Sequence, residues 1–247
     1  MTNACLRSVT TRVSAVKGLA SLAAIIAASL ASASAEEPPR ISLQSSSDFA
    51  SYGAFYTDLT VTFSPFGSLW EPGWRVQVIG SARRYSMIDS GEKRIGLDTT
   101  LDGLVGYQFT ANGWSLLVAA GPSMVDTHLY AGPGLSSSNT MKFGAKVLSS
   151  VYGNPTSNTM VYAQAHYNTG SEFFYVQGKT GVAIAQNLFV GPEVAFSGSW
   201  TYDQVRLGGH LTGFTFAGLS SGVSLGFVRD SNYGKGFYAG LNLQANF

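Results

Sequence analysis

The chain has 247 residues, of which 13% are aromatic and only 12% are charged, against roughly 25% charged in a typical soluble domain. No stretch of 18 apolar residues occurs, so the sequence offers no candidate membrane-spanning helix. The apolar residues must therefore follow a period of two, as in a barrel whose outer face meets lipid. With 15 Lys and Arg against 14 Asp and Glu, no concentrated basic surface is expected, which argues against a nucleic-acid partner.

The first 35 residues have the pattern of a secretory signal peptide. Arg7, Arg12 and Lys17 precede an apolar segment at residues 19–30, and Ala-Ser-Ala at 33–35 forms a small-residue cleavage site. The apolar segment is too short for a retained anchor helix. We therefore expect a signal peptide at residues 1–35 and one barrel domain at residues 36–247.

Alternating segments follow along the rest of the chain. In the last one, residues 237–247, apolar residues at odd positions alternate with polar or small residues at even positions. This alternation is typical of strands with one face toward lipid and the other toward a polar lumen. In chain order, the predicted strands are residues 41–48, 51–63, 73–85, 95–109, 113–125, 141–152, 159–168, 172–184, 187–197, 202–214, 219–229 and 237–247.

The first segment, residues 41–48, is short, and it is assigned as a strand because bacterial single-chain barrels have an even strand number. Merging two weak segments would instead give ten strands. The predicted fold class is all-β: an antiparallel transmembrane β-barrel of about 12 strands, with ten as the alternative, in the outer membrane of a Gram-negative bacterium.

The gaps between strands predict the orientation of the barrel. With the C-terminal end in the periplasm, the longest gap, 126–139, lies outside, and the shortest turns lie inside, with 64–72 as the exception. Aromatic residues near strand ends, such as Trp74 and Trp200, fit interfacial girdles, whereas a soluble β-sandwich would spread them along its strands. The terminal Phe247 resembles the signal that outer-membrane barrels present to the barrel assembly machinery.

Charged residues on the polar face are assigned to the lumen, because charges at membrane depth need water or partners. Asp98 and Asp102 lie on the strand after Arg75 and Arg83, so cross-strand ion pairs are expected. Six inward cations against three carboxylates predict a partly hydrated, basic lumen. A plugged scaffold and a hydrated passage both stay open. The predicted lumen-lining residues are Arg75, Arg83, Asp98, Asp102, Lys142, Lys146, Lys179, Glu193, Arg206 and His210.

The candidates for chemistry are few. A hydrolase needs a Ser beside a His with a third orienting group. His166 and Ser171 lie close together in sequence, but no motif marks that serine, and His128 is expected in the outer loop beside Asp126. The single cysteine, Cys5, lies in the signal, and no metal-ligand spacing occurs. We therefore expect no enzyme activity, no catalytic or metal-binding residues and no cofactor.

Several segments together resemble a known family. They are residues 73–76 (GWRV), 143–147 (FGAKV), 188–194 (LFVGPEV), 202–208 (YDQVRLG) and 222–230 (GVSLGFVRD). The chain looks like a member of the cellulose biosynthesis protein BcsS family, and GPE at 191–193 and RLG at 206–208 are the most specific pieces. The resemblance implies an outer-membrane barrel of a cellulose secretion system, with no catalytic motif that maps onto these residues. One departure is the serine tract at 136–138, where acidic loops are expected.

Three functions therefore stand as hypotheses. The first is a non-enzymatic barrel accessory to the biosynthesis or secretion of cellulose or another exopolysaccharide. The others are a small general porin or surface antigen, and an outer-membrane lipid hydrolase. The expected partners are outer-membrane lipid and lipopolysaccharide, the barrel assembly machinery, and cellulose or components of the cellulose synthase complex.

Overall fold

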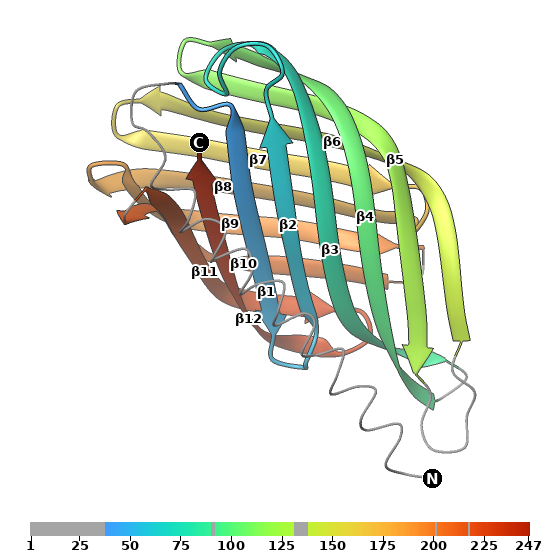
Figure 1. Cartoon of the computed structure of the whole chain (residues 1–247). Helices are drawn as coiled ribbons and strands as arrows, with labels where there is room; N and C mark the ends of the chain where they lie inside the picture. Colours follow the sequence, from blue (N-terminus) through green and yellow to red (C-terminus); the bar gives the residue numbers. More distant parts are fainter. Residues whose placement is uncertain (1–37, 90–91, 131–137, 201, 217) are drawn as a thin grey trace.

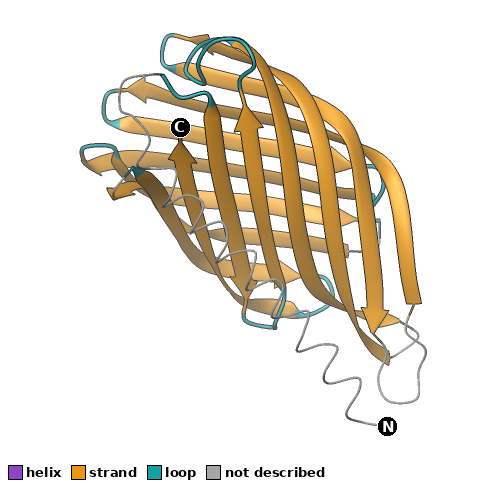
Figure 2. Cartoon of the chain, viewed as in Figure 1, coloured by secondary structure: helices purple, strands orange, loops and turns teal. Residues whose placement is uncertain are grey.

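The computed structural model describes residues 38–89, 92–130, 138–200, 202–216 and 218–247. Within these ranges every regular element is a β-strand, and the strands close into one barrel of twelve, which excludes the alternative of ten (Figure 2). The signal peptide expected at residues 1–35 lies outside the described residues. The strands are β1 (Ile41–Ala50), β2 (Phe55–Phe63), β3 (Gly73–Asp89), β4 (Glu92–Ala111), β5 (Trp114–Tyr130), β6 (Ser138–Thr156), β7 (Thr159–Asn168), β8 (Phe173–Ala185), β9 (Leu188–Ser199), β10 (Tyr202–Phe216), β11 (Leu219–Asp230) and β12 (Gly234–Asn246).

The first and last strands close the barrel. Each strand pairs antiparallel with its neighbours in the chain, and β1 pairs with β12, with Ser46 opposite Asn242 (Figure 1). The final residue extends this seam: the Phe247 N–H donates to Ile41, and its carbonyl accepts from the Arg40 and Ile41 N–H groups. Closure leaves no unpaired strand edge, as a bilayer requires.

The outward side chains form an apolar band. Large residues there are 37–66% exposed, which a protein surrounded by water would avoid on this scale. Aromatic side chains such as Trp74 and Phe109 border the band at the periplasmic end, as in an interfacial girdle. The barrel is therefore built for the outer membrane. Members of the band are Val61, Val78, Leu101, Val105, Val118, Val147, Leu207, Leu225 and Leu241. No helix among the described residues could cross a membrane.

The strands from β3 to β6 are longer than predicted. They have 17 to 20 residues, and Figure 1 shows β3, β4 and β5 reaching furthest from the end where the C terminus lies. Residues 86–89, 92–94, 126–130 and 138–139, expected in outer loops, therefore belong to strands, because backbone pairing continues beyond the apolar band that the sequence pattern detects. His128 lies on β5 rather than in a loop, with Nε2 2.9 Å from Asp126 Oδ2.

Candidate functional site in the barrel lumen

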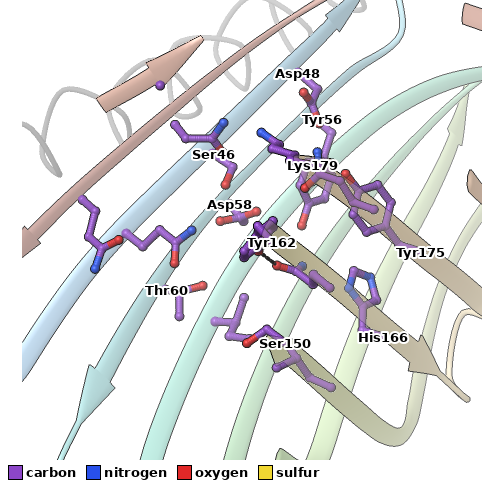
Figure 3. A pocket seen from close by; sticks show the side chains of 18 of the residues that line it. Ser46, Asp48, Tyr56, Asp58, Thr60, Ser150, Tyr162, His166, Tyr175 and Lys179 are labelled. Atoms are coloured by element: carbon purple, nitrogen blue, oxygen red, sulfur yellow. Dashed lines mark hydrogen bonds between the residues drawn. The ribbon is translucent and has the colours of Figure 1, made fainter. Parts of the chain in front are cut away.

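The lumen holds a cavity of about 1640 Å³. Asn246 and Trp114 line it near the periplasmic end, and Leu129 and Asn232 line it near the outer end, so it extends along the whole barrel. Figure 3 shows side chains of β1 and β2, among them Asp58, and of β7 and β8 projecting into the same space. The lumen is thus hollow over its length, and its lining decides what can enter.

Two ion pairs join residues directly opposite each other on adjacent strands. Arg83 of β3 faces Asp98 of β4, with Nη2 2.5 Å from Oδ2, and Lys179 of β8 faces Glu193 of β9, with Nζ 2.8 Å from Oε2. Ser224 of β11 donates to the same Glu193 oxygen at 2.6 Å. Cross-strand pairing between β3 and β4 was expected, and Arg83 with Asp98 forms such a pair.

A third ion pair reaches over an intervening strand. Lys146 Nζ of β6 lies 2.7 Å from Asp102 Oδ2 of β4. Gly121 of the intervening strand β5 is the residue opposite Lys146. Because Gly121 has no side chain, it leaves the lysine a path across β5. Both side chains are almost fully buried, at 6% and 0% exposure. Asp102 therefore pairs with Lys146 of β6, and not with an arginine of β3 as the sequence analysis expected.

The fourth pair spans the barrel seam. Arg206 of β10 lies 3.0 Å from Asp48 of β1, across β11 and β12. Gly240 of β12 is directly opposite Asp48, and a Cβ atom there would lie 2.8 Å from the Asp48 carboxylate. A glycine again makes room for a pair between strands that are not neighbours.

Arg75 has a structural setting. Its guanidinium is fully buried and donates to the backbone carbonyls of Ser68, Leu69 and Glu71, and to Gln108 Oε1. These acceptors belong mainly to the long periplasmic turn, residues 64–72, and Leu69 of that turn lines the cavity. Arg75 therefore fixes this turn at the periplasmic mouth, and its charge is spread over carbonyl dipoles rather than presented to the lumen.

Lys142 and His210 complete the predicted set. Lys142 is exposed and lines the cavity. His210 is buried, with Nε2 3.0 Å from the Thr180 carbonyl and Nδ1 2.9 Å from Thr212 Oγ1, so both ring nitrogens are engaged. Of the ten predicted residues, Arg83, Asp98, Lys142, Lys146, Lys179 and Arg206 line the cavity, whereas Arg75, Asp102, Glu193 and His210 are buried behind its surface.

Three inward carboxylates were missing from the sequence-based set. Asp48 pairs with Arg206, Asp58 lines the cavity, and Asp230 is buried at the outer mouth. The predicted count of six cations against three carboxylates is therefore wrong, and the lumen is close to charge balance. The alternation of β1 and β2 carried a signal for Asp48 and Asp58, since each lies on the polar face of its strand.

The outer mouth contains a stacked pair of tyrosines, and hydrogen bonds to neighbouring strands hold one of them. The rings of Tyr52 and Tyr233 stack with centroids 4.9 Å apart, and Tyr52 donates to Asp230 at 2.9 Å while accepting from Gln204 at 2.6 Å. Tyr52 lies in the turn after β1. Burial, and then the charge of Asp230, raise the pKa of Tyr52 above its ordinary value, so its hydroxyl stays a donor.

The periplasmic half of the lumen has two kinds of wall. One wall, on β1, β2, β11 and β12, carries neutral hydroxyl and amide groups. The strands from β3 to β9 and the 64–72 turn contribute apolar and aromatic groups, interspersed with further hydroxyls and amides such as those of Gln77, Gln108 and Ser150, and part of the apolar set packs as a cluster with the buried Leu104. The polar wall consists of Ser42, Gln44, Ser46, Thr60, Thr62, Ser220, Asn242, Gln244 and Asn246, and the apolar groups of the mixed wall are Leu69, Trp70, Ile79, Trp114, Leu117, Leu148, Met160 and Phe189.

A comparison of sequences identifies the family of the chain. A family model for cellulose biosynthesis protein BcsS matches residues 43–247. Among curated proteins, none matches the sequence. Similar solved structures include the β-domain of the Bordetella autotransporter BrkA, 12% identical over 85% of this chain and 99% of that chain, with a TM-score of 0.49. The KdgM porin is 9% identical over 83% and 99%, with a TM-score of 0.47. Outer membrane phospholipase A from Escherichia coli is 11% identical over 90% and 97%, with a TM-score of 0.44. The family model covers most of the length of this chain, which therefore belongs to the cellulose biosynthesis protein BcsS family, as an outer-membrane β-barrel.

Proposed function

We propose that the chain is a non-enzymatic accessory barrel of cellulose secretion and that its lumen takes up a neutral glucan chain. The observation that carries the proposal is the lining of the periplasmic half of the lumen, where a wall of hydroxyls and amides on β1, β2, β11 and β12 is accompanied by a wall on which apolar and aromatic groups are set among further amides and hydroxyls.

These walls match the two surfaces of a β-linked glucan. Each glucose ring carries hydroxyl groups around its edge and C–H groups on its flat faces. Side chains such as Gln44 and Asn242 can exchange hydrogen bonds with the edges. The rings of Trp114, which is exposed, and of Tyr162, which is half-buried, line the cavity and offer contact area for the faces.

The charges of the lumen support a neutral ligand. Arg83, Lys146, Lys179 and Arg206 each have a carboxylate partner inside the barrel. The ion pairs neutralise one another, so the lumen has little excess charge with which to favour a charged polymer. The basic lumen expected from the sequence loses its basis with the corrected charge count.

The histidines support the non-enzymatic part of the proposal. His166 stacks against Tyr175, with ring centroids 5.4 Å apart, and its buried Nδ1 has no hydrogen-bond partner among the described residues. Neither ring nitrogen of His210 contacts a serine. Among the described residues, no group of three His, Cys, Asp or Glu side chains could hold a metal ion. A serine-reactive fluorophosphonate should leave the folded barrel unlabelled, and labelling that Ser171→Ala removes would contradict this part.

Planar-bilayer recordings test the glucan part. Cellohexaose added on the periplasmic side should reduce the current through the wild-type barrel, and maltohexaose, which has the same units but a different shape, should reduce it less. Tyr162→Ala removes a ring that lines the cavity and should weaken the cellohexaose block about fivefold, the effect of losing roughly 1 kcal/mol of ring contact. The matched control is Tyr107→Ala, which removes a ring beside Trp74 at the periplasmic rim.

Three results would contradict the lumen assignment. A barrel without conductance that also fails to bind cellohexaose would be a closed scaffold. Equal block by both sugars would identify a general porin. Equal effects of Tyr162→Ala and Tyr107→Ala would place the sugar outside the cavity.

A further inference from the structure

Two cations face each other on the outside of the barrel at its outer rim. Arg229 near the end of β11 is directly opposite Lys235 at the start of β12, and both are exposed. Like charges directly opposite each other on neighbouring strands destabilise a sheet, because their side chains start only about 5 Å apart. The arrangement is therefore unfavourable unless an anion lies between them.

Among the described residues, no carboxylate lies between these two cations. Asp230 follows Arg229 in the chain but faces inward, where Tyr52 and Gln204 hold it. Asp203, on the exposed rim of β10, forms no ion pair with either cation, and neither Arg229 nor Lys235 makes a side-chain hydrogen bond or ion pair within the described chain. The two positive charges are left for a partner outside the protein.

The surface below the cations is apolar. Phe227 lies opposite Phe237 on the same two strands, with ring centroids 5.1 Å apart and exposures of 67% and 63%. Leu207 of β10 lies opposite Phe227 and is 62% exposed. A lipid with an anionic headgroup fits this surface: its headgroup would lie at the level of the two cations, and its acyl chains would lie against the aromatic pair below.

We propose that Arg229 and Lys235 bind a phosphate of the glycolipid in the outer leaflet, the lipid A part of lipopolysaccharide, while its acyl chains pack on Phe227, Phe237 and Leu207. The Arg229 guanidinium donates two parallel hydrogen bonds to phosphate oxygens, and the Lys235 ammonium donates to a further oxygen. This site is independent of the lumen and of any glucan in it. It would tie the β11–β12 hairpin to the outer leaflet.

Titration in lipid nanodiscs tests the site. The mature wild-type barrel is titrated with bisphosphorylated lipid A and with the same lipid stripped of phosphate, and binding is counted by native mass spectrometry. The double variant Arg229→Gln with Lys235→Gln should bind bisphosphorylated lipid A about tenfold more weakly and should match wild type for the phosphate-free lipid. Lys142→Gln, which removes an exposed cation from the lumen, is the control and should bind like wild type.

Two further measurements control for misfolding of the variants and for binding of free phosphate. Heat-modifiable migration on gels shows that each variant is folded. Arg229→Lys keeps the charge but loses the paired donors, and should therefore bind with an affinity between those of wild type and the double variant. Inorganic phosphate at millimolar concentration should not compete. Unchanged binding by the double variant, equal loss with Lys142→Gln, or full competition by inorganic phosphate would overturn the proposal.

Discussion

The lumen and the outer rim of the barrel hold similar cations in opposite situations. Inside, Lys146 and Lys179 lie 2.7 and 2.8 Å from carboxylates on other strands. At the rim, Arg229 and Lys235 face each other with no carboxylate between them. Cations that are buried in the barrel wall are thus paired within the barrel, because a buried unpaired charge is costly. Charges on its outer face can be left to the molecules of the membrane.

The largest expected loss of stability follows from breaking an ion pair that is buried in the barrel. Asp102→Asn leaves the nearly buried Lys146 without its carboxylate and should lower the free energy of unfolding by about 3–5 kcal/mol. Urea unfolding of the barrel in phosphate-free lipid vesicles measures this. Lys235→Gln removes one rim charge and should change the same quantity by less than about 0.5 kcal/mol. Replacing both partners, Asp102→Leu with Lys146→Met, should restore much of the loss. Equal effects of Asp102→Asn and Lys235→Gln would abolish the distinction between enclosed and rim charges.

The two faces of one strand give the next effect. Leu241 of β12 faces lipid and is 41% exposed, whereas the adjacent Asn242 lines the cavity. Arginine at position 241 should destabilise the barrel by about 2–4 kcal/mol, because it places a charge in the apolar band. The same change at 242 should cost far less, since the lumen offers water. Unfolding from vesicles compares the two variants, and similar losses would contradict the face assignment.

The twelve strands and their faces were predictable from sequence because alternation with a period of two is a local property. Pairing between the arginines of β3 and the aspartates of β4 was predictable for the same reason, since these strands are consecutive, but the register decides that Arg83 meets Asp98. Lys146 with Asp102 was not, because it requires the register that places Gly121 between them. Register and closure arise from the whole barrel rather than from any one segment.

The seam and the rim show the same limit. Arg206 meets Asp48 only after β1 joins β12, at the opposite end of the chain. Arg229 and Lys235 lie six residues apart in sequence, but their direct opposition depends on the turn that joins β11 to β12. Arg75 shows a further limit: its position predicted a lumen charge, but its guanidinium holds the 64–72 turn, whose path has no periodic signal.

Closure of the barrel separates the lumen charges from the rim charges. Deleting Phe247 tests how far closure depends on the last residue. Deleting this residue removes three backbone hydrogen bonds to Arg40 and Ile41, each worth about 1 kcal/mol net. We also expect slower assembly, because the chain loses its terminal aromatic. The fraction of heat-modifiable barrel in outer-membrane extracts measures the result. Phe247→Tyr keeps the backbone and an aromatic ring, and should assemble normally. Normal accumulation of the deletion variant would show that the seam closes without this residue.

The smallest effect concerns the carboxylate that lies next to the rim cations but faces the lumen. Tyr52→Phe removes the hydroxyl that donates to Asp230 at 2.9 Å and should lower the free energy of unfolding by about 1.5 kcal/mol. The raised pKa of Tyr52 predicts how this difference varies with pH. A raised pKa contributes stability that is fully present below the unfolded value of about 10 and is lost as pH rises above it, because the unfolded tyrosine then releases its proton first. The gap between wild type and Tyr52→Phe should therefore be constant from about pH 6 to about pH 9 and should shrink above about pH 10. Unfolding series across this range, with Tyr107→Phe as the control, measure it. A gap that widens above pH 10 would mean that Tyr52 ionises more easily in the folded barrel, and that Asp230 is not held inward by this hydroxyl.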